Sequence, residues 1–349
     1  MTMRMEDVVI VVGLTVVQLV FWGNSIMLSY LMSLGLNPLA FAITSALATS
    51  LLLSPFALSF ERSLWPAKFT FKLTLLFLSA AVGGVTLFQT LFMRGIHLTS
   101  ATMGTAMPNL CPGFTFVIAW IMRLEKVDLN CVYSRVKILG TVLCVSGALI
   151  LSLIHSKAAD EPLPLPPSAK DITFDQEKIV GCLYLLAAIL ALSSLIILQA
   201  VILIEFPAPM SVCGITSLIG SLTTLAALLL EGNGFNTAWA NLSPGRLAGF
   251  SFLGGAVGAG GLSFHVWVVK KRGPVLASIF NPISTVCSVI FSVVTSQETI
   301  SLPSLGGMAL LFTGLYLVLW SKGKEGRSYS TITAIRPIAL IDEEKPLLS

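Results

Sequence analysis

A long apolar stretch occupies residues 179–204, which read IVGCLYLLAAILALSSLIILQAVILI. An α-helix rises 1.5 Å per residue, so about 20 mostly apolar residues are enough to cross the hydrocarbon core of a bilayer. Membrane-spanning β-strands would instead alternate in polarity over about 10 residues. Residues 8–17 (VVIVVGLTVV) show the same unbroken apolarity. Both stretches therefore favour membrane-spanning helices.

The composition of the whole chain indicates the same class of protein. Of its 349 residues, 55% are hydrophobic and 11% are charged, whereas a soluble protein carries about 25% charged residues. A chain so poor in charge cannot cover a water-facing surface, which excludes a disordered chain, a secreted disulfide scaffold and a nucleic-acid binder. The 6 cysteines show no metal-ligand spacing and are interpreted as small core residues; no metal or cofactor is expected.

Further apolar stretches of this kind predict an all-α integral membrane protein with ten transmembrane helices. The first stretch is expected to remain as a span rather than be cleaved as a signal peptide, because its apolar part is too long and no cleavage site follows it. The predicted spans are residues 8–30, 36–59, 73–93, 98–121, 138–155, 179–204, 208–230, 247–269, 274–296 and 302–321.

The basic residues predict the orientation of the chain. If the amino terminus lies in the cytosol, most of the 21 Lys and Arg residues fall in cytosolic segments, as the positive-inside rule requires. The longest loop on the opposite side, residues 156–178, is rich in proline and acidic residues. We therefore expect both termini to be cytosolic.

The chain also resembles itself at an offset of about 170 residues. Residues 77–83 (FLSAAVG) match 252–258 (FLGGAVG), and the sequence Ile-Thr-Ser occurs at both 43–45 and 215–217. Each copy would contain five spans, so the second copy enters the membrane from the other side, an inverted repeat typical of secondary transporters. Further matches in the same order are Pro108-Asn109 with Asn281-Pro282, and Gly140 and Gly147 with Gly307 and Gly314.

This repeat predicts the domain organisation. It divides the chain into a first five-helix repeat at residues 1–155, a non-cytosolic linker loop at 156–178, a second five-helix repeat at 179–321 and a cytosolic tail at 322–349.

Several short segments resemble signature segments of one membrane protein family. They are residues 98–102 (LTSAT), 106–110 (AMPNL), 123–127 (RLEKV), 272–275 (RGPV), 280–282 (FNP) and 314–320 (GLYLVLW). In these segments the chain resembles the plant EamA-like transporters, the nodulin-type or walls-are-thin-related branch of the DMT superfamily. The resemblance implies two EamA-like repeats of five helices, cytosolic termini and the movement of small metabolites, with amino acids and auxin as family substrates.

Two prolines beside asparagines mark the expected substrate site. Proline removes a helical N–H donor and frees carbonyl groups one turn earlier, and membrane helices break where they line a cavity. Because the breaks fall in repeat-related spans, we expect both to line the site. The alternative is that the prolines only kink the helices and the amides bond neighbouring helices. The residues concerned are Pro108 and Asn109 in the fourth span, and Asn281, Pro282, Ser284 and Thr285 in the ninth.

Two further polar residues at mid-span depth are weaker candidates for substrate binding. Gln18 lies in the first predicted span and Ser193 in the sixth. A single amide can instead join two helices, and a serine often bonds its own helix backbone. No Asp, Glu, Lys or Arg falls near the middle of any predicted span. This favours a neutral or zwitterionic substrate over a phosphorylated one.

The sequence therefore predicts a secondary transporter or facilitator that moves small neutral or zwitterionic metabolites, above all amino acids, by alternating access. Two alternatives stay open. One is an exporter of auxin or another indole-type organic acid, and the other is a non-transporting receptor or scaffold on the same fold. An enzyme is not expected, because no pairing of nucleophile and base and no buried carboxylate pair is found. Small-molecule substrate and lipid bilayer are the expected partners, and the oligomeric state stays open.

Two peripheral signals complete the predictions. Glu343, Leu347 and Leu348 fit an acidic dileucine signal for a sorting adaptor on the cytosolic tail. The alternative is a polar tail that happens to end in two leucines. The expected location is the plasma membrane or the vacuolar membrane. Asn241 begins a glycosylation sequon, although Pro244 follows it closely.

Overall fold

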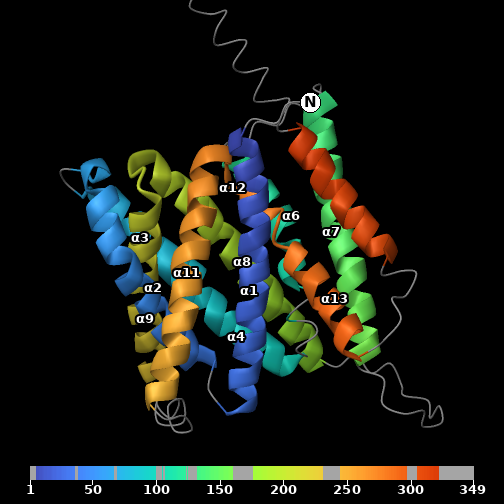
Figure 1. The fold of residues 1–349 in the computed structure, drawn as a ribbon, viewed down its shortest axis with the longest axis horizontal. Helices are drawn as coiled ribbons and strands as arrows, with labels where there is room; N and C mark the ends of the chain where they lie inside the picture. Colours follow the sequence, from blue (N-terminus) through green and yellow to red (C-terminus); the bar gives the residue numbers. More distant parts are fainter. Residues whose placement is uncertain are drawn as a thin grey trace, which may run out of the picture.

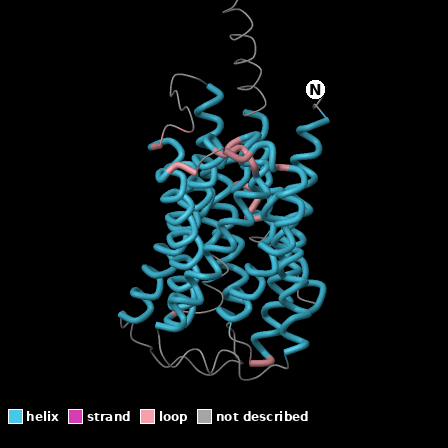
Figure 2. Tube along the Cα trace, turned by 90° about the vertical axis from the view of Figure 1, so that its left-hand side faces the viewer, coloured by secondary structure: helices cyan, strands magenta, loops and turns pink. Residues whose placement is uncertain are grey.

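The computed structural model describes residues 5–35, 38–66, 69–99, 104, 107–122, 124, 132–159, 176–230, 244–296 and 305–321. These ranges are helical and contain no strand, and their helices run side by side in one bundle (Figures 1 and 2). Within them, six helices are long and apolar enough to cross a membrane. The six are Met5–Leu28, Pro38–Phe60, Phe71–Leu98, Ile179–Glu205, Pro209–Leu230 and Gly245–Arg272. The chain is thus a multi-pass helical membrane protein, and the count of ten spans stays a prediction.

The first three helical segments follow the predicted spans closely. Helix α1 covers Met5–Ser33 and α2 covers Pro38–Phe60. The third segment consists of α3 (Phe71–Ala81), the π-helical turn η2 (Val82–Leu87) and α4 (Phe88–Leu98). Its π-turn contains Gly83 and Gly84, and such turns mark local irregularity within a helix, frequently at functional sites.

The fourth predicted span differs from the structure at its beginning. The preceding helix continues to Leu98, whereas the described helix of the fourth span begins with the 3₁₀ turn η3 (Met107–Leu110) and continues as α6 (Cys111–Ile121). The prolines at 108 and 112 explain the change of helix type, because each lacks the N–H that an α-helix interior needs and fits a first turn instead. Helix α7 (Val132–Ala159) follows.

The next three helices are long and continuous. They are α8 (Gln176–Glu205), α9 (Pro209–Leu230) and α11 (Pro244–Arg272). Pro209 begins α9, where its missing N–H removes no helical hydrogen bond.

The ninth predicted span is broken in its first half. Gly273 has φ 86° and precedes the short helix α12 (Pro274–Ser278), and α13 (Ile283–Ser296) begins after a turn at residues 279–282. In that turn the Asn281 N–H donates to the Ser278 carbonyl at 3.0 Å. Pro282 cannot donate a backbone hydrogen bond, which accounts for the interruption. The last described helix covers Leu305–Ser321.

Repeat-matched glycines let two of these helices touch. A Cβ atom on Gly140 of α7 would lie 2.8 Å from the Gly314 carbonyl oxygen, and one on Gly147 would lie 2.6 Å from the Leu311 nitrogen. Side chains at these positions would force α7 away from the helix Leu305–Ser321. Small residues of this kind are typical of close helix packing in membranes.

Candidate functional site

Four of the predicted site residues meet at the two helix breaks. The Gln18 Nε2 of α1 donates to the Asn281 Oδ1 at 3.2 Å, and the Thr285 Oγ1 of α13 donates to the Asn109 Oδ1 of η3 at 2.9 Å. Gln18 is 4% exposed and Asn109 is 2% exposed. Side-chain amides therefore connect α1 with the turn before α13, and η3 with α13. This arrangement brings the two Pro-Asn pairs together, as the prediction of one shared site requires.

Ser193 adds α8 to this group. Its hydroxyl donates to the Cys111 carbonyl at 3.3 Å and lies 3.5 Å from the Cys111 sulfur. The Cys111 sulfur also lies 3.8 Å from the Thr115 hydroxyl. We call Gln18, Asn109, Cys111, Ser193, Asn281 and Thr285 the amide cluster. Cys111 is a fully buried core residue, as predicted, and its thiol lies beside these polar groups.

The other three predicted residues support the breaks. The Ser284 hydroxyl donates to the Asn281 carbonyl at 2.9 Å, which satisfies an acceptor that the broken helix exposes. Pro282 is buried in the turn before α13, and Pro108 is partly buried in η3. The amide cluster is internally hydrogen-bonded, and none of its members lines the cavity described next. A role in substrate binding stays a prediction for these eight residues.

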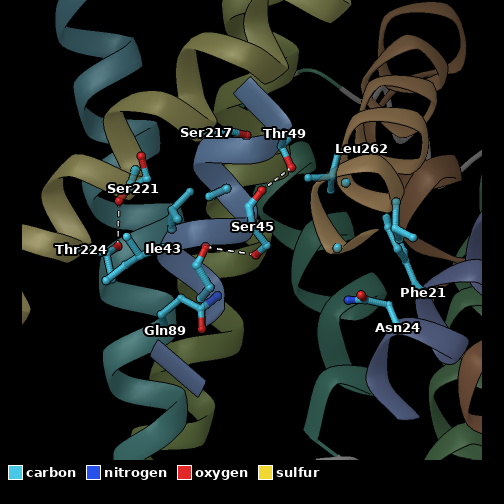
Figure 3. A pocket seen from close by; sticks show the side chains of 17 residues that line it. Phe21, Asn24, Ile43, Ser45, Thr49, Gln89, Ser217, Ser221, Thr224 and Leu262 are labelled. Carbon is cyan, nitrogen blue, oxygen red and sulfur yellow. Dashed lines mark hydrogen bonds between the residues drawn. The ribbon is translucent and has the colours of Figure 1, made fainter. Parts of the chain in front are cut away.

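A polar cavity of about 240 Å³ lies elsewhere in the bundle (Figure 3). Helices α1, α2, α9 and α11 and the η2–α4 segment form its walls. Its lining residues are Phe21, Asn24, Ala42, Ile43, Ser45, Ala46, Thr49, Val85, Gln89, Ser217, Gly220, Ser221, Thr224, Gly254, Val257, Gly258 and Leu262. We call this space the polar cavity.

The described walls of the polar cavity combine seven hydroxyl or amide side chains with seven apolar side chains and three glycines. None of the described residues that line it is Asp, Glu, Lys, Arg or His. In Figure 3, Asn24 and Phe21 of α1 face Ser45 and Gln89 from the opposite side. Pockets for drug-sized ligands have volumes of about 300–1,000 Å³, so this smaller cavity suits a small metabolite.

None of the lining residues is among the predicted site residues, yet the repeat matches include several of them. Ser45 and Ser217 are the final residues of the two Ile-Thr-Ser copies, and Val257 and Gly258 end the second FLxxAVG copy. Repeat-related segments meet at the interface between the halves, where transporters of this architecture bind substrate. The repeat was therefore a usable signal for the cavity.

Charged residues join the two halves at the end of the bundle that carries the start of α1. Arg272 of α11 pairs with Asp7 of α1, and Lys271 pairs with Glu6 at 3.5 Å. Lys72 of α3 also pairs with Glu205 of α8. All six side chains are partly exposed. We call these three contacts the end ion pairs.

A buried carboxylate makes a stronger contact at the same end. Glu61 follows α2 and is 8% exposed. It accepts hydrogen bonds from the backbone N–H of Met210 at 3.0 Å, the N–H of Ser211 at 2.7 Å and the Ser211 hydroxyl at 2.8 Å. The Trp65 Nε1 donates to the same hydroxyl at 2.9 Å. Glu61 thus caps the first turn of α9, whose N–H groups have no partner within the helix.

Comparison with known proteins identifies the family to which this helical bundle belongs. The model of the EamA-like transporter family matches residues 9–153 and again residues 179–320. The chain belongs to the EamA-like transporter family. As a member of this family it is a membrane transporter rather than an enzyme, and the sequence-based recognition of a plant nodulin-type EamA protein is confirmed.

Relatives of this EamA-like transporter occur in Arabidopsis thaliana. WAT1-related protein At5g47470 is 50% identical over 353 residues, which cover 100% of this chain and 94% of that protein. WAT1-related protein At4g16620 is 51% identical over 90% of this chain and 89% of its own length. A solved crystal structure of another protein superposes with a TM-score of 0.63 over 90% of this chain and 96% of that one at 14% identity, which shows a shared fold alone.

The predicted peripheral signals fall outside the described part of this EamA-like transporter. Asn241 lies in the range 231–243, and Glu343, Leu347 and Leu348 lie in the range 322–349. The sorting signal and the glycosylation site stay predictions.

Proposed function

We propose that this EamA-like transporter is a secondary transporter or facilitator of small neutral or zwitterionic metabolites, above all amino acids. The observation that carries the proposal is the polar cavity, an uncharged space walled by helices from both halves of the chain. Hydroxyls and amides can hold both poles of a zwitterion without a fixed charge. A phosphorylated substrate would instead need Arg or Lys in the wall.

The proposed architecture is ten helices in two inverted five-helix repeats, with both termini in the cytosol. The two ranges matched by the family model, 9–153 and 179–320, support a division at residues 1–155 and 179–321. The breaks at η3 and at residues 279–282 support it further, because both fall in the fourth segment of a half. In this orientation the end ion pairs lie on the cytosolic side.

Alternating access requires that one end of the pathway be closed while the other is open. Three residues of helix α1 show the depths of these features along the bundle. Asp7 lies at the cytosolic end, Gln18 in the amide cluster and Asn24 in the polar cavity. At 1.5 Å per residue these positions are separated by about 16 Å and about 9 Å. Measured along α1, the amide cluster and the end ion pairs lie between the depth of the cavity and the cytosolic end, which supports a state closed on that side. We assign the amide cluster to the next part of the substrate pathway.

A cavity-filling substitution tests the proposal. Ala46→Phe would fill the polar cavity from α2, and Leu51→Phe is the matched control, because Leu51 is 72% exposed on the same helix. Oocytes preloaded with labelled amino acids and indole acids would be assayed for efflux, with surface protein measured in parallel. We expect amino-acid efflux that Ala46→Phe abolishes and Leu51→Phe preserves.

Three results would contradict the proposal, each in a different way. Unchanged efflux through Ala46→Phe would show that substrate does not use this cavity. Efflux of indole acids without amino acids would favour the auxin alternative. Absence of efflux for every solute, with normal surface protein, would favour a receptor or scaffold.

A further inference from the structure

Asn24 carries an unusual unpaired acceptor. Among the described residues, its Oδ1 is the one buried side-chain nitrogen or oxygen atom without a hydrogen-bond partner. The residue lines the polar cavity, and Figure 3 shows its amide directed from α1 towards the side of Gln89. A buried acceptor without a partner is unfavourable, so such an atom in a binding cavity calls for a donor from the ligand.

Four of the five hydroxyls that line the cavity also act as acceptors towards it. Each of four lining hydroxyls donates its proton to a backbone carbonyl three or four residues earlier on its own helix. The donor–acceptor distances are 3.2 Å for Ser45, 2.9 Å for Thr49, 2.8 Å for Ser221 and 2.7 Å for Thr224. A hydroxyl has one proton and two lone pairs. With the proton engaged, these groups can offer a ligand only lone pairs.

The polar cavity thus presents more acceptors than donors. The lining amide N–H groups belong to Asn24 and Gln89, and no described lining residue is cationic. A primary ammonium group has three donors and no acceptor, which complements such a wall. A carboxylate has acceptors alone, so the amide N–H groups of Asn24 and Gln89 are the part of this wall that suits the other pole of a zwitterion.

We infer that the polar cavity binds the ammonium group of the substrate and that Asn24 is a specificity-determining residue. Its Oδ1 accepts one N–H of the ammonium, and hydroxyl lone pairs from α2 and α9 accept the others. This assignment rests on the proposed function and narrows it to substrates with a primary amine. A hydroxy acid of the same size is bound more weakly, because its hydroxyl offers one neutral donor where the ammonium offers three charged ones.

Matched substrate pairs test the assignment in proteoliposomes. The probes are L-alanine with L-lactate and L-phenylalanine with phenyllactate, because each pair differs in the replacement of the amine by a hydroxyl. Wild-type protein is expected to exchange the amino acids and to accept each hydroxy acid at least about tenfold less well, since hydrogen bonds to charged groups are strong.

Variants of Asn24 separate recognition from folding. Asn24→Leu removes the acceptor at similar size and is expected to raise the amino-acid KM about tenfold and to reduce the discrimination within each pair. Asn24→Asp keeps an acceptor and is expected to retain the preference for the amine. Ile26→Leu, at a 39% exposed site nearby on α1, is the control. Thermal unfolding of the purified variants adds a second measurement, because Asn24→Leu removes an unpaired buried group and should not lower Tm.

The outcomes distinguish this inference from the proposed function. Wild-type exchange of amino acids together with equal exchange of the hydroxy acids would overturn the ammonium assignment alone. An unchanged KM in Asn24→Leu would do the same for the role of Asn24. Failure of wild-type protein to exchange any amino acid would overturn both proposals.

Discussion

Replacing Glu61 by alanine should destabilise the protein more than breaking any of the end ion pairs. The carboxylate accepts three hydrogen bonds at 2.7–3.0 Å from the first turn of α9 and is 8% exposed. Loss of a helix cap costs about 1 kcal/mol. Hydrogen bonds to a charged group contribute about 1.5–3 kcal/mol each, although solvent reaches this end and the contributions are not additive. We expect Glu61→Ala to lower the free energy of unfolding by about 3 kcal/mol.

Two comparison variants make this prediction specific. Glu61→Gln keeps one acceptor oxygen but turns an NH₂ group towards backbone donors, so it should lose part of the stability, about 1–2 kcal/mol. Lys72→Ala removes a partly exposed pair with Glu205 and should change the stability by about 0–1 kcal/mol. The assay is thermal unfolding of purified protein in detergent. The predicted order of Tm is wild type and Lys72→Ala together, then Glu61→Gln, then Glu61→Ala.

The reasoning is refuted if Glu61→Ala unfolds at the same temperature as Lys72→Ala. That result would mean that the first turn of α9 finds other acceptors or water when the carboxylate is removed. An equal loss of stability in Glu61→Gln and Glu61→Ala would also contradict the reasoning. It would show that the negative charge of Glu61, rather than its number of acceptor atoms, determines the stability that it contributes.

Three further predictions concern packing, the amide cluster and ion coupling. Gly147→Leu should prevent accumulation of folded protein in the membrane, because its Cβ would lie 2.6 Å from the Leu311 nitrogen. The control is Gly306→Leu, which should accumulate normally in the same immunoblot because a Cβ there meets nothing within 4 Å. Asn109→Ala combined with Asn281→Ala should reduce amino-acid efflux at least about tenfold while the amount of protein at the cell surface stays normal. Lost stability with unchanged efflux would show instead that the amide cluster only joins helices, at about 1 kcal/mol per hydrogen bond. Amino-acid counterflow in proteoliposomes should persist without a pH gradient, because no described residue lining the polar cavity is Asp, Glu or His; obligate dependence on a gradient would contradict this.

The amide cluster could be predicted because its signals are local in the sequence. A proline beside an asparagine identifies both a helix break and a polar side chain at one depth, and the same pair at Asn109 and Asn281 relates two spans. The contacts that assemble the cluster are not local. The bond from Gln18 to Asn281 joins residues 263 positions apart, and no feature of either segment specifies the partner.

The polar cavity could not be read from single positions. Its hydroxyls lie on two helices far apart in the sequence, α2 and α9. A serine or threonine in a membrane helix most often bonds its own backbone, as Ser45 and Ser221 do. Their shared space exists only once the helices are packed. Depth within the first span favours Gln18, whereas the unpaired state of the Asn24 Oδ1 is a property of its surroundings.

The helix cap that Glu61 provides could not be predicted from the sequence. Its place after an apolar helix suggests a solvated loop charge, and the helix that it caps begins about 150 residues later. Short-range patterns identify a cap only when the acidic residue precedes its own helix. A cap supplied from another part of the chain is a property of the tertiary fold.

The strengths of the contacts along the closed end indicate which of them can open during transport. The end ion pairs are partly exposed and are worth about 0–1 kcal/mol each, and an amide pair such as Gln18 with Asn281 is worth about 0.6 kcal/mol. Their sum is a few kcal/mol, the scale of a conformational equilibrium with a measurable minor state. The three bonds of Glu61 together approach or exceed that whole sum. Opening at the cytosolic end is therefore expected to separate α1 from α11 and α3 from α8, while Glu61 holds the end of α2 to α9 as the point about which the halves move.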